Sequence, residues 1–258
     1  MNTSIVRRVR SLVAELLRNT GVARLSWMSE PTPRWIAGPL TNAALALAVE
    51  LFATKPRKGG GTPYLSHLLA VSALVMEHGG SEVQAAGGLL HDAIEDVKIS
   101  GDELALRLEQ RGASQADAAA VAKIVEACTD GTHGQKRDGE DWLQRKMEYL
   151  RTLKEKRPSD PAMLVSLADK VHNIEATLTE IRGGTTAEEF YGQSGFNAGA
   201  VKQKWYYSTL THTFADKFGT HKEAGMLVKR LTSAVDEIFR SVEDWRPGDD
   251  PTAGTDSR

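Results

Sequence analysis

Apolar residues recur at helical spacing along almost the whole chain, and this periodicity is the feature that most restricts the possible folds. No stretch of strand length alternates convincingly between apolar and polar residues. The pattern therefore predicts an all-α fold. The predicted helices cover approximately residues 5–18, 41–53, 64–78, 81–91, a segment begun by Ser100, 114–128, 140–156, 161–182, a short segment 187–191, 201–218 and 221–245.

The chain length of 258 residues fits one domain with short appendages. We expect a helix and a loop rich in Pro and Trp in residues 1–39, the main helical domain in 40–218, and a helix packed on it in 219–245. The last segment, 246–258, lacks apolar periodicity, and we expect it to be disordered.

Composition excludes several classes of partner. The net charge is −2, so the chain has no basic surplus for binding nucleic acid through its phosphates. The single cysteine, Cys128, excludes an intrachain disulfide and a thiolate zinc cluster. The longest apolar run, Ala43–Val49, is far below the roughly 20 residues of a membrane span. We expect a cytoplasmic protein without a nucleic-acid or membrane partner; a homo-oligomer is compatible with the sequence.

Two imidazoles and two carboxylates form a candidate metal site: His67, His91, Asp92 and Asp169. Mixed nitrogen and oxygen ligands without sulfur favour Mn²⁺, Fe²⁺ or Zn²⁺. Each residue has a simpler alternative. A single histidine in an apolar segment is more often a hydrogen-bonded core residue, and Asp169 alone fits an ion pair with a lysine.

The acids Glu95 and Asp96 follow His91 and Asp92 at a spacing of four residues. If the helix continues, both acids share a face with these two residues. Placing four ionisable groups on one turn is costly unless a cation lies among them. A solvated acidic helix end is the alternative, but the preceding apolar segment 85–90 favours burial.

Three segments together resemble the HD-type metal-dependent phosphohydrolases, and more narrowly the alarmone hydrolases of the stringent response. Residues 61–67 are similar to the family segment Gly-x-Pro-Tyr-x-x-His, and residues 90–96 to Leu-His-Asp-x-x-Glu-Asp. Residues 167–173 resemble Ala-Asp-Lys-x-x-Asn. The three segments lie between residues 57 and 173, and a looser helical similarity extends over about 40–218. The resemblance implies an HD-domain helical bundle.

The resemblance also implies a role for each residue. The four candidate ligands would hold one Mn²⁺, with Fe²⁺ and Zn²⁺ as the other candidates, and Glu95 and Asp96 would position and deprotonate the attacking water. The substrate contacts would be Arg57, Lys58 and Asn173. Lys55, Arg57 and Lys58 lie on a glycine-rich loop, where they can neutralise a polyphosphate.

Two regions differ from the family pattern, and the role of a third region is undecided. Glu175 stands where family members often carry Arg, and the loop 129–136 differs from better-known members. Lys136 in that loop is a further candidate phosphate contact, with a solvated lysine as the alternative. One of Trp205, Tyr206 and Tyr207 could border a base pocket; packing in the helix core is the alternative.

The implied reaction is hydrolysis of the 3′-pyrophosphate of the guanosine alarmones ppGpp and pppGpp to GDP or GTP and pyrophosphate. One alternative is an enzyme for another nucleotide with a 2′- or 3′-phosphate, such as an adenine alarmone or NADPH. Another is a regulatory module that binds nucleotide without turnover, against which the intact pair Glu95 and Asp96 argues.

Overall fold

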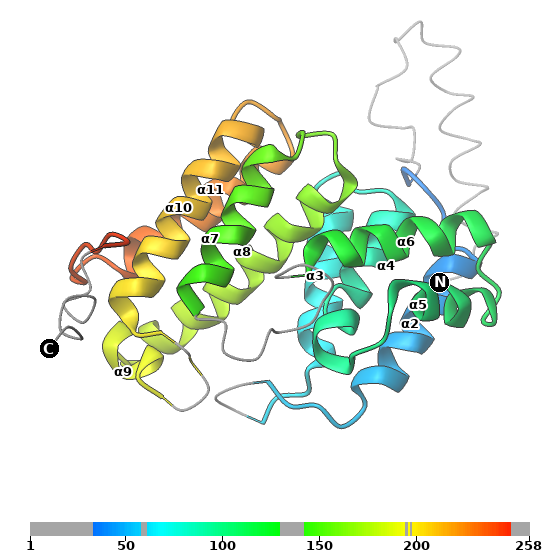
Figure 1. The fold of residues 1–258 in the computed structure, drawn as a ribbon, viewed down its shortest axis with the longest axis horizontal. Helices are drawn as coiled ribbons and strands as arrows, with labels where there is room; N and C mark the ends of the chain where they lie inside the picture. The colour runs from blue at the N-terminus through cyan, green and yellow to red at the C-terminus, as the bar shows by residue number, and fades with distance from the viewer. Residues whose placement is uncertain (1–32, 58–60, 130–141, 194–195, 197, 249–258) are drawn as a thin grey trace, which may run out of the picture. The chain divides into compact units, whose positions relative to one another are not determined.

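A computed structural model describes residues 33–57, 61–129, 142–193, 196 and 198–248, and within these ranges it confirms an all-α fold (Figure 1). The chain divides into two compact units, residues 1–34 and 35–258, and all described helices belong to the second unit. These helices are α2 (Pro39–Phe52), α3 (Leu65–Glu77), α4 (Glu82–Leu90), the π-helix η2 (Ala93–Val97), α5 (Gly101–Glu109), α6 (Gln115–Cys128), α7 (Trp142–Glu155), α8 (Pro161–Arg182), α9 (Ala187–Tyr191), α10 (Ala200–Phe218) and α11 (Ala224–Ile238).

Short polar side chains begin several of these helices. Ser81 forms a complete capping box with Gln84 at the start of α4. The hydroxyls of Ser100 and Ser114 accept hydrogen bonds from the third amide of α5 and α6, respectively. Asp160 caps α8 by accepting a hydrogen bond from the amide of Ala162. These caps explain why the predicted first residues of these helices agree closely with the observed ones.

The buried apolar side chains form two clusters that share helices. The first cluster contains side chains of α2, α5 and η2, and the second contains those of α7 to α11. Helices α3, α4 and α6 contribute to both clusters. In Figure 1, α7, α8 and α10 run beside one another on one side of this unit, and α2 and α5 lie on the other. Helices α3, α4 and α6 therefore connect the two hydrophobic clusters.

Two consecutive glycines allow α4 to pack unusually close to its neighbours. A Cβ atom on Gly87 would lie 2.7 Å from Ile124 Cγ2 of α6. A Cβ atom on Gly88 would lie 3.1 Å from Ser72 Cα of α3. The Ser72 hydroxyl donates a hydrogen bond of 2.9 Å to the carbonyl of Ala85 at the same contact. These contacts fix the end of α4, where His91 follows, against α3.

A carboxylate on α4 also anchors the start of α2. Oε1 of Glu82 accepts hydrogen bonds from the amides of Gly38 and Thr41 and from the Thr41 hydroxyl, at 2.9, 3.1 and 2.7 Å. The first amides of a helix have no partner within the helix, and a negative charge there is favourable. Glu82 therefore caps α2 from a different helix.

The chain does not continue as an α-helix after His91. The prediction that Glu95 and Asp96 share a face with His91 and Asp92 required such a continuation. Helix α4 ends at Leu90, a turn follows at His91 and Asp92, and Ala93–Val97 forms a single π-helical turn. This turn ends at Lys98, whose backbone is left-handed with a φ of 67°. A π turn has more residues per turn than an α-helix, so a spacing of four residues no longer fixes the angle between His91 and Glu95 or between Asp92 and Asp96.

The end of the chain shows a second difference. The helix expected over 221–245 begins at Ala224 and ends at Ile238. The amide of Ala224 donates to His221 Nδ1, and the nonhelical segment that follows keeps Phe239 and Val242 buried. The predicted helix over 5–18 lies outside the described residues, as does the part of the predicted disordered segment 246–258 that follows residue 248. No helix in the described part of the chain is both long and apolar enough to span a membrane.

Candidate metal centre

Three helices bring the predicted ligands together. His67 is the third residue of α3, His91 and Asp92 follow directly after α4, and Asp169 lies near the middle of α8. His67, His91 and Asp169 are buried, with exposed fractions of 1%, 4% and 8%. Ala85–Leu90 before His91 is buried throughout, as its sequence indicated. The fold thus encloses the proposed ligands among apolar helices.

The ligand atoms converge on one point. The Nε2 atoms of His67 and His91 are 3.2 Å apart, and Asp169 Oδ1 lies 3.2 Å and 3.5 Å from them, respectively. These three atoms form a group that could hold a metal ion. Asp92 Oδ2 lies 3.0 Å from His91 Nε2 and 3.7 Å from His67 Nε2. The structure therefore brings all four predicted ligands together.

These separations fit a divalent cation. Nitrogen and oxygen ligands bind such a cation at about 2.0 to 2.2 Å, so adjacent ligand atoms lie about 3 to 3.6 Å apart in tetrahedral or octahedral geometry. Four of the five separations among the Nε2 atoms and the facing carboxylate oxygens, 3.0 to 3.5 Å, fall in this range, and the 3.7 Å between Asp92 Oδ2 and His67 Nε2 lies just above it. Two imidazoles and two carboxylates are also a donor set that first-row divalent metals accept.

Each proposed ligand has a second hydrogen-bond partner that orients it. His91 Nδ1 lies 2.8 Å from the carbonyl of Gly88, which can only accept, so in the neutral ring Nδ1 carries the proton and Nε2 keeps its lone pair. The Tyr64 hydroxyl donates to Asp92 Oδ2 at 2.5 Å, and Asn173 Nδ2 donates to Asp169 Oδ1 at 2.6 Å. Partners of this kind are typical of metal ligands in proteins.

The charges of the site shift the pKa values of its members. Burial lowers the pKa of His67 below its usual value. Burial alone would lower the pKa of His91 as well, but the Asp92 and Asp169 carboxylates outweigh it and raise this pKa. Burial would raise the pKa of Asp92, but His91 outweighs it and lowers this pKa. The carboxylates thus remain ionised and face the two Nε2 atoms.

The pKa of Asp169 is also lowered, because Lys170 and the two histidines outweigh the effect of burial. The Lys170 ammonium lies 2.8 Å from Asp169 Oδ2 and 5.0 Å from the centroid of the Tyr149 ring. Asp169 therefore forms the lysine ion pair that was the simpler reading of this residue and also faces the two histidines. The two interpretations are compatible, because the two oxygens of the carboxylate have different neighbours.

The acids Glu95 and Asp96 lie on η2, directly after the ligand pair. Glu95 is half-buried, whereas Asp96 is exposed and forms an ion pair with Lys55. The Lys55 ammonium also lies 4.0 Å from the centroid of the Tyr64 ring. Tyr64 in turn donates to Asp92, so Asp96 is connected to a proposed ligand through Lys55 and Tyr64.

The structure describes two of the four proposed substrate contacts. Arg57 Nη2 donates a hydrogen bond of 3.1 Å to Asn173 Oδ1, and Asn173 also binds Asp169. Arg57 and Asn173 therefore lie at the edge of the ligand cluster. Lys58 and Lys136 lie outside the described residues.

The candidate base contacts pack into the helix core. Tyr206 and Tyr207 are buried in the second hydrophobic cluster, and Trp205 packs against that cluster. Trp142 makes edge contacts with both Trp205 and Tyr206. The packing alternative therefore describes these three residues in this structure.

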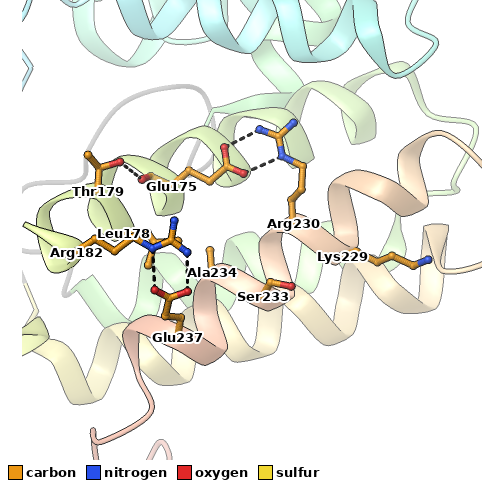
Figure 2. A pocket seen from close by; sticks show the side chains of 9 residues that line it. All are labelled: Glu175, Leu178, Thr179, Arg182, Lys229, Arg230, Ser233, Ala234 and Glu237. Atoms are coloured by element: carbon orange, nitrogen blue, oxygen red, sulfur yellow. Dashed lines mark hydrogen bonds and ion pairs between the residues drawn. The ribbon is translucent and has the colours of Figure 1, made fainter.

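Glu175 belongs to a separate surface cleft between α8 and α11, shown in Figure 2. This cleft has a volume of about 440 Å³, and none of the proposed metal ligands lines it. Arg230 donates two hydrogen bonds to Glu175, and Arg182 donates two to Glu237. The position that often holds Arg in the family is thus occupied here by an acid paired with an arginine of α11.

Sequence reasoning assigned no function to two residues that contact the ligands, Tyr64 and His172. Both lie inside the recognised segments. His172 is three residues after Asp169 on α8, a spacing that places both side chains on one helix face. Burial and the nearby His67 and Arg57 lower the pKa of His172 to about 4. The helical spacing was the available signal for His172.

The fold and the site define a helical domain built around a histidine and aspartate centre for a divalent cation. The HD domain family matches residues 44–189, more than half of the chain, and the chain belongs to this family.

The relatives and solved structures agree with this assignment. A probable guanosine-3′,5′-bis(diphosphate) 3′-pyrophosphohydrolase of Synechocystis is 26% identical over 193 residues, which are 72% of this chain and 24% of that protein. The guanosine-3′,5′-bis(diphosphate) 3′-pyrophosphohydrolase MESH1 of Xenopus tropicalis is 34% identical over 146 residues, 52% of this chain and 70% of that protein. The chain thus spans about a quarter of the first relative.

Two solved structures share the fold. A metazoan SpoT ortholog that hydrolyses ppGpp aligns with a TM-score of 0.54 and 20% identity, covering 80% of this chain and 96% of that one. A protein of Listeria monocytogenes aligns with a TM-score of 0.51 and 19% identity, covering 67% and 99%. At these identities the likeness concerns the fold.

Proposed function

We propose that the chain is a metal-dependent hydrolase that removes the 3′-pyrophosphate of ppGpp and pppGpp. The observation that carries this proposal is the convergence of His67, His91, Asp92 and Asp169 next to the acidic turn of Glu95 and Asp96. The printed activities of the Synechocystis and Xenopus relatives supply the substrate class.

The proposed cofactor is one Mn²⁺, with Fe²⁺ and Zn²⁺ as alternatives that the same donor set accepts. The ligands are His67 and His91 through Nε2, and Asp92 and Asp169 through a carboxylate oxygen. When bound, a divalent cation supplies Lewis acidity, which lowers the pKa of water and withdraws charge from a phosphoryl oxygen. The protein fixes its own four donor atoms before binding, since each has a second partner.

Glu95 and Asp96 are the proposed catalytic carboxylates. One of them accepts a proton as water attacks the phosphorus atom attached to the 3′-oxygen of the ribose. The bond between this phosphorus and the 3′-oxygen breaks, pyrophosphate forms, and the 3′-oxygen takes up a proton. Water thus supplies both the new oxygen on phosphorus and the protons that balance the reaction.

Positive side chains beside the ligand cluster bind the polyphosphate. Arg57 is held by Asn173, and Lys55 lies between Asp96 and the Tyr64 ring. A multiply charged substrate would be repelled by the acids of the site without these cations. Lys58 and Lys136 remain predicted contacts, as does a direct contact between Asn173 and the ribose or phosphates.

The proposal includes a cytoplasmic location and the four predicted segments with boundaries at residues 39, 218 and 245. Helix α11 supports a close association of the third segment with the second, because its apolar side chains belong to the same cluster as those of α8 and α10. The proposed partner is a small nucleotide polyphosphate.

A hydrolysis screen of the purified chain with Mn²⁺ tests the function. The substrates are ppGpp, pppGpp, the matching adenine alarmones, NADPH and simple mononucleotides, and the products are resolved by anion-exchange chromatography. We expect pyrophosphate and GDP or GTP from the guanosine alarmones. Faster turnover of an adenine alarmone or NADPH would assign that nucleotide as the substrate. Nucleotide binding without any product would instead indicate a regulatory module. The Asp169→Asn variant is the matched control for contaminating phosphatases.

A further inference from the structure

His67 presents its two ring nitrogens to different partners. Its Nε2 atom lies in the ligand cluster, and its Nδ1 atom lies 2.8 Å from Nδ1 of His172 on α8. The two rings are tilted by 44°, with their centroids 4.9 Å apart. Outside the ligand cluster, two ring nitrogens 2.8 Å apart share a hydrogen atom, because two lone pairs would repel at this separation. The two Nε2 atoms, 3.2 Å apart, are instead spaced as two ligands of one cation.

Only one arrangement of that hydrogen allows His67 to bind a cation. A neutral imidazole has one N–H group, so only one of the two Nδ1 atoms can donate. If His67 donates, its Nε2 lone pair points into the ligand cluster. If His172 donates, the proton of His67 lies on Nε2 and occupies the direction that a cation needs.

The other histidine ligand has no such choice. His91 Nδ1 faces the carbonyl of Gly88, and a carbonyl can only accept a hydrogen bond. His67 faces a side chain that can either donate or accept. Its ligating form therefore depends on the tautomer of its partner.

We propose that His172 is a positioning residue whose Nδ1 accepts the hydrogen bond from His67 Nδ1 and thereby holds His67 in the tautomer that ligates through Nε2. This inference rests on the metal centre of the proposed function and deepens it. Helix α8 then has two roles in the site, because Asp169 is a ligand and His172, three residues later, orients the ligand of α3.

Two substitutions separate hydrogen bonding from packing. In His172→Asn, the amide oxygen can take the place of Nδ1 and still accept the hydrogen bond. In His172→Leu, a side chain of similar bulk has no acceptor. Losing the partner of a histidine ligand typically costs about 10- to 100-fold in metal affinity, so we expect a loss of this size for His172→Leu and at most about threefold for His172→Asn.

Zn²⁺ titration of the purified variants against a fluorescent chelator measures this affinity without any substrate. Equal affinity of His172→Leu and the wild type would overturn the inference, as would an equal loss in both variants. A thermal melt of each metal-free variant shows whether it is folded. If His172→Leu does not fold, the affinity of His172→Asn and the nitrogen NMR spectrum of the wild type test the inference.

Nitrogen NMR of the histidine-labelled wild type loaded with Zn²⁺ reads the tautomer directly. We expect His172 to carry its proton on Nε2 and to have a bare Nδ1. A proton of His172 on Nδ1 would overturn the inference while leaving the metal centre intact. A wild-type chain that binds no Zn²⁺ or Mn²⁺ would instead overturn the metal centre, and with it both the proposed function and the role of His172.

Discussion

Gly88 of α4 lies so close to Ser72 of α3 that a Cβ atom on the glycine would be 3.1 Å from Ser72 Cα and 3.2 Å from its backbone nitrogen. Backbone atoms in the middle of a helix cannot move aside as a flexible side chain can. The distance between α3 and α4 therefore depends on the missing side chain. Since α3 provides His67 and the end of α4 is followed by His91, the same contact sets the spacing of two proposed ligands.

Gly88→Ala should force α3 and α4 apart. We expect a loss of about 1 to 3 kcal/mol in the free energy of unfolding, as is typical of overpacked cores, together with weaker Zn²⁺ binding. Urea denaturation and metal titration measure the two effects. Gly199→Ala is the control, because a Cβ there meets nothing within 4 Å; it should cost less than about 1 kcal/mol. An unchanged Gly88→Ala protein would show that the helices can separate freely.

Asp169→Asn should remove bound metal while preserving the fold. The variant keeps the shape of the side chain but loses the charge that faces both histidines, and buried cation sites require that charge. Metal analysis after dialysis should find little Mn²⁺ in the variant. Asp160→Asn, at the N-cap of α8, should retain its metal because asparagine is also a good cap. Full occupancy in Asp169→Asn would remove this residue from the ligand set.

Glu95→Gln should separate metal binding from turnover. Glu95 is not one of the four proposed ligands, so the variant should bind Mn²⁺ normally. Its kcat for ppGpp should fall by about 10² to 10⁴, the usual contribution of a general acid or base. Glu103→Gln on α5 is the control and should keep its rate. A wild-type rate in metal-loaded Glu95→Gln would show that another group accepts the proton. Asp96→Asn would then be the next variant to measure.

Glu82→Gln should destabilise the chain in a pH-dependent manner. Partial burial would raise the pKa of Glu82, but hydrogen bonds from Thr41 and Gly38 outweigh it and lower this pKa below 4.5. A lowered pKa in the folded state gives stability that is present above about pH 4.5 and is lost as the pH falls through the folded pKa. We expect a cost of about 1 to 2 kcal/mol at pH 7.

Urea midpoints of the wild type and Glu82→Gln, measured from pH 7 to pH 3, test this prediction. The difference between the two proteins should narrow on the acid side of pH 4.5. A difference that stays constant with pH would mean that the charge of Glu82 contributes nothing and that packing alone explains the loss. Glu109→Gln, at the end of α5, serves as the control for a change of charge elsewhere.

The helices could be predicted well where local signals define their ends. Asp160 and Pro161 begin α8, Gly183 follows its end, and the predicted range agrees with the observed one. The end of α11 had no comparable signal, and the predicted helix continued past Ile238. There, burial of Phe239 and Val242 in a nonhelical segment preserves the apolar pattern without the helix.

The four proposed ligands could be named from the sequence because they lie within recognisable segments, but their partners depend on contacts between distant helices. The hydrogen bond between His67 and His172 joins α3 to α8, which no local pattern encodes. The π turn at Glu95 was missed because a spacing of four residues looks the same in sequence whether or not the backbone stays α-helical. Lys55 was expected to meet phosphate; its ion pair with Asp96 requires the folded loop.

The proposed ligands lie far apart along the chain, and this separation affects the stability of the folded protein. His67 and Asp169 are about 100 residues apart in sequence, so an ion that binds both closes a long loop, as a cross-link does. An ion that binds the folded chain also stabilises it by an amount that grows with the concentration of the ion. The ion would thus connect α3 to α8 and oppose their separation. If metal is scarce, the folded chain would be less stable and would also lose its catalytic activity.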